Sequence, residues 1–224
     1  MDWQAFLLTV KLAVLVTAIL LVLGLPIAYW LTYSRRRWKF LIEAVVGMPL
    51  VLPPTVLGFY ILLALGSKSP IGRWWEALTG HTLAFTFEAL VIGSVIYSLP
   101  FTVQPLAAAF STVDAKFVAA SATLGASRLR TFFRIILPLS VSGLLTAIAL
   151  TFAHTMGEFG VALMVGGNIP GVTRTVSIDI YDQVQATNYA SANQTALVLL
   201  AISFVALSLV YAWNRKVWAI WPWR

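Results

Sequence analysis

Residues 111–138 read STVDAKFVAASATLGASRLRTFFRIILP, a short polar and basic stretch between two long apolar segments. Ser111 with Asp114 matches a helix-start pattern, and Asp114 also suits the positive end of a helix dipole. This first helix is expected to end at Gly125, because glycine adopts the left-handed conformation at little cost. Ser127 can then cap a second helix. The stretch therefore predicts two helices joined by a tight turn.

The two predicted helices differ in character. The first carries small side chains at 119–122, which let another surface approach closely. The second places its apolar residues on one face, at i, i+3, i+4 and i+7: Leu129, Phe132, Phe133 and Ile136. A helix of this kind can lie flat on a lipid surface. The small-residue arm and the glycine favour instead an elbow that docks into a groove of a partner protein.

Apolar segments flank this elbow on both sides. A helix needs about 20 apolar residues to cross the hydrocarbon of a bilayer, and the chain offers five such spans, at 6–33, 41–65, 83–110, 135–156 and 196–213. With 60% apolar and 10% charged residues, a water-soluble fold could not cover its apolar surface. We therefore expect an all-α, polytopic membrane protein. Residues 1–224 form one transmembrane domain, with the elbow at about 111–136 in the cytoplasm.

Basic residues determine the predicted orientation. They gather after the first span, between the third and fourth, and after the fifth: Arg35, Arg36, Arg37 and Lys39, then Lys116, Arg128, Arg130 and Arg134, then Arg215, Lys216 and Arg224. The opposite side has Lys68, Arg73 and Arg174, with Lys11 near the outer end of the first span. The positive-inside rule then places the N-terminus outside and the C-terminus in the cytoplasm. The same bias explains the net charge of +7, so nucleic acid is not an expected partner.

Residues 158–193 do not fit a full span. A short apolar piece at 161–165 is followed by the glycine-rich run 166–171, and a short helix is expected at 176–184. A re-entrant or surface loop fits best, because irregular backbone at membrane depth must be covered by protein or face water. Two short spans in its place would keep the same sidedness. Prolines inside three spans, Pro53 and Pro54 among them, kink or break helices; kinks for packing alone are the alternative, but their clustering favours a transport path over a simple anchor.

The elbow resembles the shared loop of the integral membrane subunits of ATP-binding-cassette importers. That loop has the form E-A-A, three residues, G, nine residues, I-x-L-P, and leucine commonly precedes its glycine. This chain matches the form at these positions: Ala120, Leu124, Gly125, Ile135, Leu137 and Pro138. Ala119 stands where the glutamate is common, and Ser121 where the second alanine is common.

Other stretches resemble the oxyanion branch of these permeases. Residues 48–60, MPLVLPPTVLGFY, look like the second span of molybdate importer permeases. The motifs GEFG at 157–160, GNIPG at 167–171 and TRT at 173–175 are similar to those of molybdate, tungstate and sulfate permeases. Molybdate is the expected substrate because of the proline-rich second span. Tungstate and sulfate or thiosulfate are the alternatives.

The resemblance also implies an assembly. In a type I importer two permease subunits form the channel, two cytoplasmic ATP-binding subunits dock on the elbows, and an external binding protein delivers the anion. Molybdate permeases resemble homodimers, so the second permease is expected to be another copy of this chain. The expected location is the cytoplasmic membrane of a prokaryote.

The chain itself carries no motif of an enzyme. A phosphate-binding loop needs lysine after its second glycine, but Val172 follows Gly171. The sequence has no cysteine, and its two histidines lie far apart, so neither a cofactor nor a metal is expected. ATP hydrolysis is therefore assigned to a separate subunit. A stand-alone secondary transporter is the alternative, but the inverted repeats and paired ionisable residues that would support it are not evident.

Few residues are candidates for the translocation path or its gate: His154, Glu158, Pro53 and Pro54. Neutral donors suit the passage of a doubly charged oxyanion, because a central positive charge would trap it. His154 can donate to the anion or simply pack. Glu158 would repel an anion, so we expect it to pair with a basic group or to cap backbone amides. On the outer side, Asn168 and Arg174 are candidates for contact with the anion or its binding protein, and a solvated arginine is the alternative.

Overall fold

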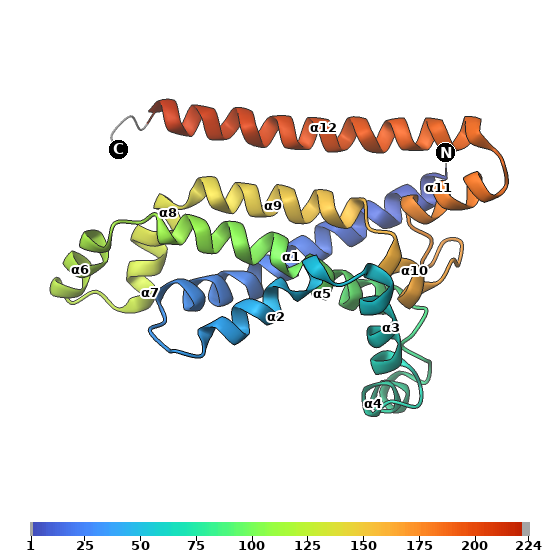
Figure 1. Cartoon of the computed structure of the whole chain (residues 1–224), viewed down its shortest axis with the longest axis horizontal. Coiled ribbons are helices and arrows are strands. Elements are labelled where there is room, and N and C mark those ends of the chain that lie inside the picture. The colour runs from blue at the N-terminus through green and yellow to red at the C-terminus, as the bar shows by residue number, and fades with distance from the viewer. Residues whose placement is uncertain (1, 221–224) are drawn as a thin grey trace.

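The first helix, α1 (Trp3–Tyr33), runs most of the length of the molecule (Figure 1). The computed structural model describes residues 2–220, and their side chains as far as Ala212. Asp2 Oδ1 caps α1 by accepting hydrogen bonds from the amides of Gln4 at 2.8 Å and Ala5 at 3.1 Å. The helix ends at Ser34, whose backbone is extended. The predicted first span, 6–33, is confirmed.

Three further long helices lie roughly along α1: α5 (Phe87–Ser111), α9 (Val141–Met156) and α12 (Tyr189–Ile220). The described residues contain no strand. Three helices, α1, α5 and the stretch Tyr189–Ala212 of α12, are each long and apolar enough to cross a membrane. Two bent helix pairs bring the possible number of spans to five. The all-α, polytopic prediction is confirmed.

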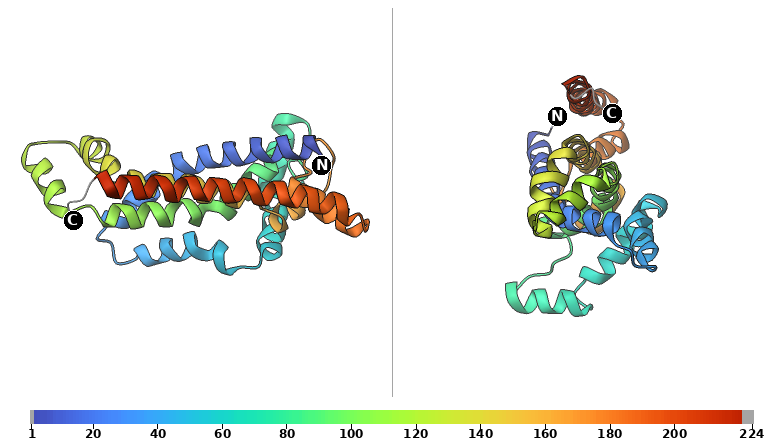
Figure 2. Two further views of the ribbon diagram at one scale, coloured as in Figure 1. Left: turned by 90° about the horizontal axis from the view of Figure 1, so that it is seen from above. Right: turned by 90° about the vertical axis from the view of Figure 1, so that its left-hand side faces the viewer.

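The second predicted span, 41–65, is not one straight helix. It consists of α2 (Lys39–Val51) and α3 (Pro54–Leu65), which meet at an angle of 113°. Proline at 53 and 54 ends one helix and begins the next, since proline lacks a donor and suits the first helical position. The chain then continues into α4 (Pro70–Thr79). Figure 2 shows α3 and α4 projecting from the side of the bundle opposite to α12.

The fourth predicted span also changes direction. Its first residues, 135–139, belong to the end of the elbow, and α9 follows after a bend of 77° at Ser140. Residues 158–193 form α10 (Gly160–Gly166), α11 (Val176–Gln185) and the start of α12, so the expected short helix at 176–184 is confirmed. Thr9 Oγ1 of α1 accepts a hydrogen bond from the Val176 amide at 2.9 Å, which ties the start of α11 to the bundle.

Two apolar clusters form the core, one in each half of the bundle. The cluster near α10 contains residues of α1, α3, α5, α10 and α11, with Leu12, Leu90 and Val161 fully buried. The cluster near the elbow contains residues of α1, α2, α5 and α9, with Leu106 and Phe110 fully buried. Because α1 and α5 contribute to both clusters, they hold the two ends of the molecule in one unit.

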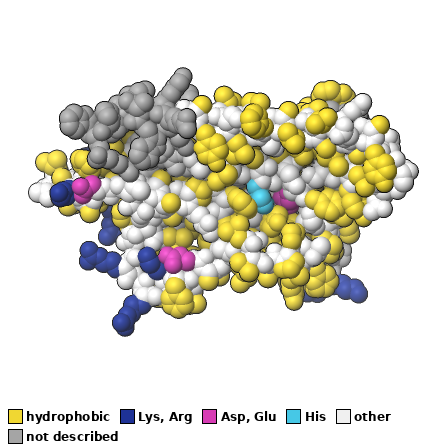
Figure 3. Space-filling view, turned by 45° about the horizontal axis from the view of Figure 1, so that its top comes forward, with side chains coloured by type: hydrophobic (Ala, Val, Ile, Leu, Met, Phe, Trp, Pro, Cys, Tyr) yellow, Lys and Arg dark blue, Asp and Glu magenta, His cyan; other side chains and the backbone are white. Residues whose placement is uncertain are grey.

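Two of the three predicted basic clusters, those after the first span and in the elbow, lie at one end of the bundle. Figure 1 places the α1–α2 connection and the elbow together at that end, whereas α4, α10 and α11 lie toward the other. Figure 3 shows most of the visible Lys and Arg side chains at the elbow end and hydrophobic side chains over much of the remaining surface. The third predicted cluster, formed by Arg215, Lys216 and Arg224, lies outside the described side chains. The side of the membrane on which this end lies stays a prediction.

The contact between α5 and α9 depends on Gly143, and Gly143→Ala is expected to lower the free energy of unfolding by about 1–3 kcal/mol. The added methyl group would overlap Ala109 Cβ and would lie 3.1 Å from the Pro105 carbonyl oxygen. Gly47→Ala is the matched control, because its methyl group would meet only Gln104 Nε2, at 4.0 Å. The stability of both variants is measured by thermal unfolding in detergent. An equal loss in the two variants would contradict tight packing at Gly143.

Candidate functional site

The elbow begins with α6 (Ala115–Thr123), capped by Asp114, which accepts a hydrogen bond from the Lys116 amide at 2.8 Å. Ser111 does not begin this helix as predicted, because it is the last residue of α5. Leu124 and Gly125 end α6 in the expected left-handed turn, with φ of +72° at Gly125. The amide of Gly125 donates to the Ala122 carbonyl, and the next amide donates to the Ser121 carbonyl, both at 3.0 Å. This pair of bonds is the Schellman motif.

The second arm contains α7 (Arg128–Thr131), a π-helical turn η1 (Phe132–Ile136) and α8 (Leu137–Leu139). Ser127 caps it, as predicted, by accepting from the Arg130 amide at 3.3 Å. The prediction of one apolar face is wrong. Ile136 is buried and Phe132 packs against the core, but Leu129 and Phe133 are exposed. Leu129 precedes the π-helical turn, and Phe133 follows the buried Phe132 directly, so each lies to one side of the buried pair.

The two arms are joined by a hydrogen bond between buried hydroxyl groups. Ser121 Oγ lies 2.8 Å from Thr131 Oγ1, and both side chains are nearly inaccessible to solvent. Ser121 is the residue that departs from the usual alanine, so its hydroxyl adds a bond that alanine could not make. This bond fixes the position of α6 relative to α7 within the elbow.

The predicted coupling residues divide into two groups along this unit. The tip exposes its members to solvent: Ala119, Ala120, Leu124 and Gly125. The members that lead back into the bundle are half-buried or exposed: Ile135, Leu137 and Pro138. The tip thus offers a small, largely apolar surface at the end of the molecule, where a second protein has access to it.

Hydroxyl side chains pair across α5 and α9 inside the bundle. Thr102 Oγ1 and Thr151 Oγ1 lie 2.6 Å apart, and Ser98 Oγ lies 3.1 Å from Thr155 Oγ1. Ser98 Oγ also lies 2.9 Å from His154 Nδ1. All four hydroxyl-bearing side chains are buried. His154 thus belongs to a polar contact between two long helices.

Glu158 follows the end of α9 and is only 4% exposed. Neither carboxyl oxygen has a hydrogen bond of standard geometry among the described residues, but the buried hydroxyl of Ser94 lies close enough to interact with the carboxyl group. The expected basic partner or set of capped amides is therefore not found there.

Pro53 and Pro54 lie where α3 meets α10. A side chain at Gly160 would come within 2.7 Å of Pro54 Cβ, and one at Gly58 within 2.7 Å of Met164 Cβ. The two helices therefore touch through small residues. The structure therefore brings the broken second span against α10, the helix that follows Glu158.

The outer candidates Asn168 and Arg174 contact each other. Arg174 Nε donates to Asn168 Oδ1 at 2.7 Å, and Asn168 Nδ2 donates to Asp182 Oδ2 at 2.6 Å. An ion pair of 3.3 Å between Arg174 and Asp182 closes the triangle. The arginine is therefore neither isolated nor fully available to an anion, and Asp182 is a partner that the sequence analysis did not identify.

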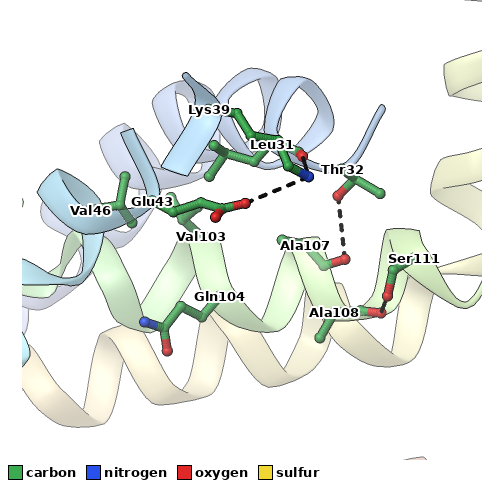
Figure 4. A pocket seen from close by; sticks show the side chains of 10 residues that line it. All are labelled: Leu31, Thr32, Lys39, Glu43, Val46, Val103, Gln104, Ala107, Ala108 and Ser111. Atoms are coloured by element: carbon green, nitrogen blue, oxygen red, sulfur yellow. Dashed lines mark hydrogen bonds and ion pairs between the residues drawn. The ribbon is translucent and has the colours of Figure 1, made fainter. Parts of the chain in front are cut away.

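A cavity of about 460 Å³ lies between α1, α2 and α5 near the elbow end (Figure 4). An ion pair of 3.7 Å between Lys39 and Glu43 lies at one side, and Thr32 donates to the Ala28 carbonyl at 2.8 Å. The full lining is Leu31, Thr32, Lys39, Glu43, Val46, Val103, Gln104, Ala107, Ala108 and Ser111. Its one cation, Lys39, is paired with Glu43, so an anion would be held there only weakly.

A family model described as "Binding-protein-dependent transport system inner membrane component" matches residues 6–219. The chain belongs to this family. It is a multi-pass permease subunit and not an enzyme, and the ATPase of such a transporter is a separate subunit. Among the described residues no group of His, Cys, Asp and Glu could hold a metal ion.

Relatives resemble this permease over nearly its whole length. The molybdenum transport system permease protein ModB of Azotobacter vinelandii is 50% identical over 214 residues, covering 96% of this chain and 95% of the relative. The Escherichia coli K12 protein of the same name is 34% identical over 217 residues, covering 96% and 94%. The match spans the elbow, the broken second span and the outer loops together.

Solved structures show the same fold. An inward-facing structure of the MetNI methionine ABC transporter matches with a TM-score of 0.76 at 16% identity, covering 97% of this chain and 96% of that chain. A bacterial alginate ABC transporter in complex with its periplasmic protein matches with a TM-score of 0.72 at 15% identity, covering 96% and 78%. The permease chain therefore has the importer fold.

The sequence analysis missed the hydroxyl groups that support His154. Their signal was a spacing of four residues inside a predicted span, at Ser94, Ser98 and Thr102. Residues four apart share one face of a helix, so this spacing predicts a polar stripe. The facing pair on α9, Thr151 and Thr155, has the same spacing. The structure brings the two stripes together.

Proposed function

We propose that this chain is the channel-forming subunit of an ATP-driven importer of molybdate in the cytoplasmic membrane of a prokaryote. The observation that carries the proposal is the 50% identity, over 96% of the chain, to a molybdenum transport permease. Permeases of the same name at 34% identity add support. The paucity of basic groups inside the long helices fits a path that passes an oxyanion without trapping it.

The proposed assembly contains two copies of this chain, two cytoplasmic ATP-binding subunits and an external oxyanion-binding protein. The exposed tip of the elbow, with Leu124 and Gly125, is the proposed dock for the ATP-binding subunits. The outer triangle of Asn168, Arg174 and Asp182 is the proposed contact for the binding protein, because a closed polar cluster is better suited to recognition than to anion capture. The N-terminus is then outside and the elbow is in the cytoplasm.

The test is ATP hydrolysis by the complete transporter in liposomes, with the external binding protein loaded with molybdate, tungstate or sulfate in turn. We expect molybdate-loaded protein to stimulate hydrolysis and sulfate to have no effect. Equal stimulation by sulfate would assign the chain to oxyanions in general. If no ATPase co-purifies with the chain, the importer proposal fails.

A further inference from the structure

The imidazole of His154 is held on three sides. Its Nδ1 atom lies 2.9 Å from Ser98 Oγ. The Phe101 ring stacks on it with centroids 3.9 Å apart and an interplanar angle of 23°, and the Tyr97 ring lies against it at 4.7 Å. A histidine that only filled space would not need both a stacked ring and a buried hydroxyl. The arrangement sets the direction in which the remaining nitrogen points.

That remaining nitrogen, Nε2, has no hydrogen-bond partner among the described residues. It is also not one of their buried unpartnered polar atoms, which belong to Trp75, Glu76, Ser94 and Glu158. The side chain as a whole is half-buried. Nε2 is therefore the ring's outward-facing atom, presented at the surface of the α5–α9 pair.

The surface beside His154 continues along α5 toward the elbow. The residues at i, i+4, i+7, i+11 and i+14 are half-buried or exposed: Tyr97, Phe101, Gln104, Ala108 and Ser111. The last three also line the 460 Å³ cavity (Figure 4). One face of α5 thus leads from the histidine, which meets the middle of α5 at Ser98, to the cavity at the elbow end.

We propose that His154 Nε2 donates a hydrogen bond to the oxyanion as it passes along this face of α5, and that Ser98 is the positioning residue for the ring. The proposal rests on the proposed function, and it assigns the substrate contact within that path. Gln104 and the cavity lie further along the same route.

The chemistry of Ser98 fits this role. A hydroxyl group both donates and accepts, so it can bond Nδ1 whether or not that nitrogen carries a proton. An oxyanion beside Nε2 favours a ring form with a proton there. Such a contact is weaker than a permanent cation, as passage through the membrane requires.

Three substitutions of His154 distinguish the contribution of Nδ1 from that of Nε2. His154→Gln places an amide near the position of Nε2, His154→Asn places one near Nδ1, and His154→Phe keeps the stacking on Phe101 and Tyr97 without any donor. We expect His154→Asn and His154→Phe to lower the rate of molybdate uptake about tenfold or more. The rate of uptake with His154→Gln should stay within about threefold of that of the parent chain. Uptake is measured in liposomes with the complete transporter and its binding protein.

Basal ATP hydrolysis, without binding protein, reports correct assembly of every variant. Uptake by His154→Phe at the parent rate would overturn the proposal. Uptake that is retained by His154→Asn but lost by His154→Gln would also overturn it, because the bond to Ser98 would then be the contact that matters. Absence of uptake by the unaltered transporter would instead contradict the proposed function. The two failures are therefore distinguishable.

Ser98 is tested in a double-mutant cycle. Ser98→Ala is expected to lower uptake in the parent chain and to have no further effect in the His154→Phe background, because there is no ring nitrogen left to position. If Ser98→Ala lowers uptake by the same factor in both backgrounds, its role is structural and the positioning assignment is wrong.

Discussion

Replacing Gly125 by valine is expected to lower substrate uptake by at least about tenfold while the transmembrane bundle remains folded. The glycine has φ of +72°, a region in which a β-branched residue costs about 1–2 kcal/mol or more. A Cβ atom there would meet nothing within 4 Å, so the whole effect comes from the backbone. The chain can relieve the strain only by opening the turn held by the amides of Gly125 and Ala126. That change would reorient α6 relative to α7, and with it the proposed dock for the ATP-binding subunit.

Gly80→Val is the matched control for this prediction. Gly80 ends α4, at the opposite end of the molecule from the elbow, with φ of +78°, and a Cβ atom there also has nothing within 4 Å. The intrinsic backbone cost is therefore the same, but the elbow is untouched. Uptake and co-purification of the ATPase are measured for both variants. Equal losses would show that the effect is general destabilisation and not coupling.

Two of the spans were predictable from the sequence because each is predominantly apolar over its length, and the prolines at 26, 100 and 105 lie inside continuous helices. The predicted segments 6–33 and 83–110 differ from α1 and α5 by only a few residues at each end. The second span was predictable in composition but not in shape. Adjacent prolines predict a break, whereas the angle of 113° depends on how α3 packs on α10. That contact joins residues about a hundred positions apart, and a local pattern contains no information about it.

The elbow was predictable because its signals are local. Asp114, Gly125 and Ser127 each act on a backbone group within a few residues. The apolar face of the second arm was mispredicted because a helical repeat shows which residues are neighbours but not which of them the bundle covers: Phe132 and Ile136 meet the core, whereas Leu129 and Phe133 do not. The polar contact at His154 was not predictable either. A hydroxyl in a helix can bond its own carbonyl four residues back, as Thr155 does at 2.9 Å, so its partner on another helix is not implied.

Leu124→Asp is expected to weaken association with the ATP-binding subunit by at least about tenfold. Leu124 is 86% exposed, at the tip of the elbow, just before the turn at Gly125. Covering a solvent-exposed leucine with a partner protein removes apolar surface from water, which stabilises the complex. An aspartate at the same place would have to be desolvated without a known cation to pair with. The measurement is the amount of ATPase that co-purifies with the tagged permease in detergent.

Val184→Asp is the control, because Val184 is 42% exposed on α11, at the opposite end of the molecule. It introduces the same charge on an exposed apolar position far from the elbow, so co-purification of the ATPase should be unchanged. If Leu124→Asp retained the ATPase but lost uptake, the tip would transmit motion without contributing affinity, and Ser121 and Thr131 would be the next residues to test. If both association and uptake were retained, the elbow tip would not be the docking surface, and the exposed residues of the second arm, Leu129 and Phe133, would have to carry the contact.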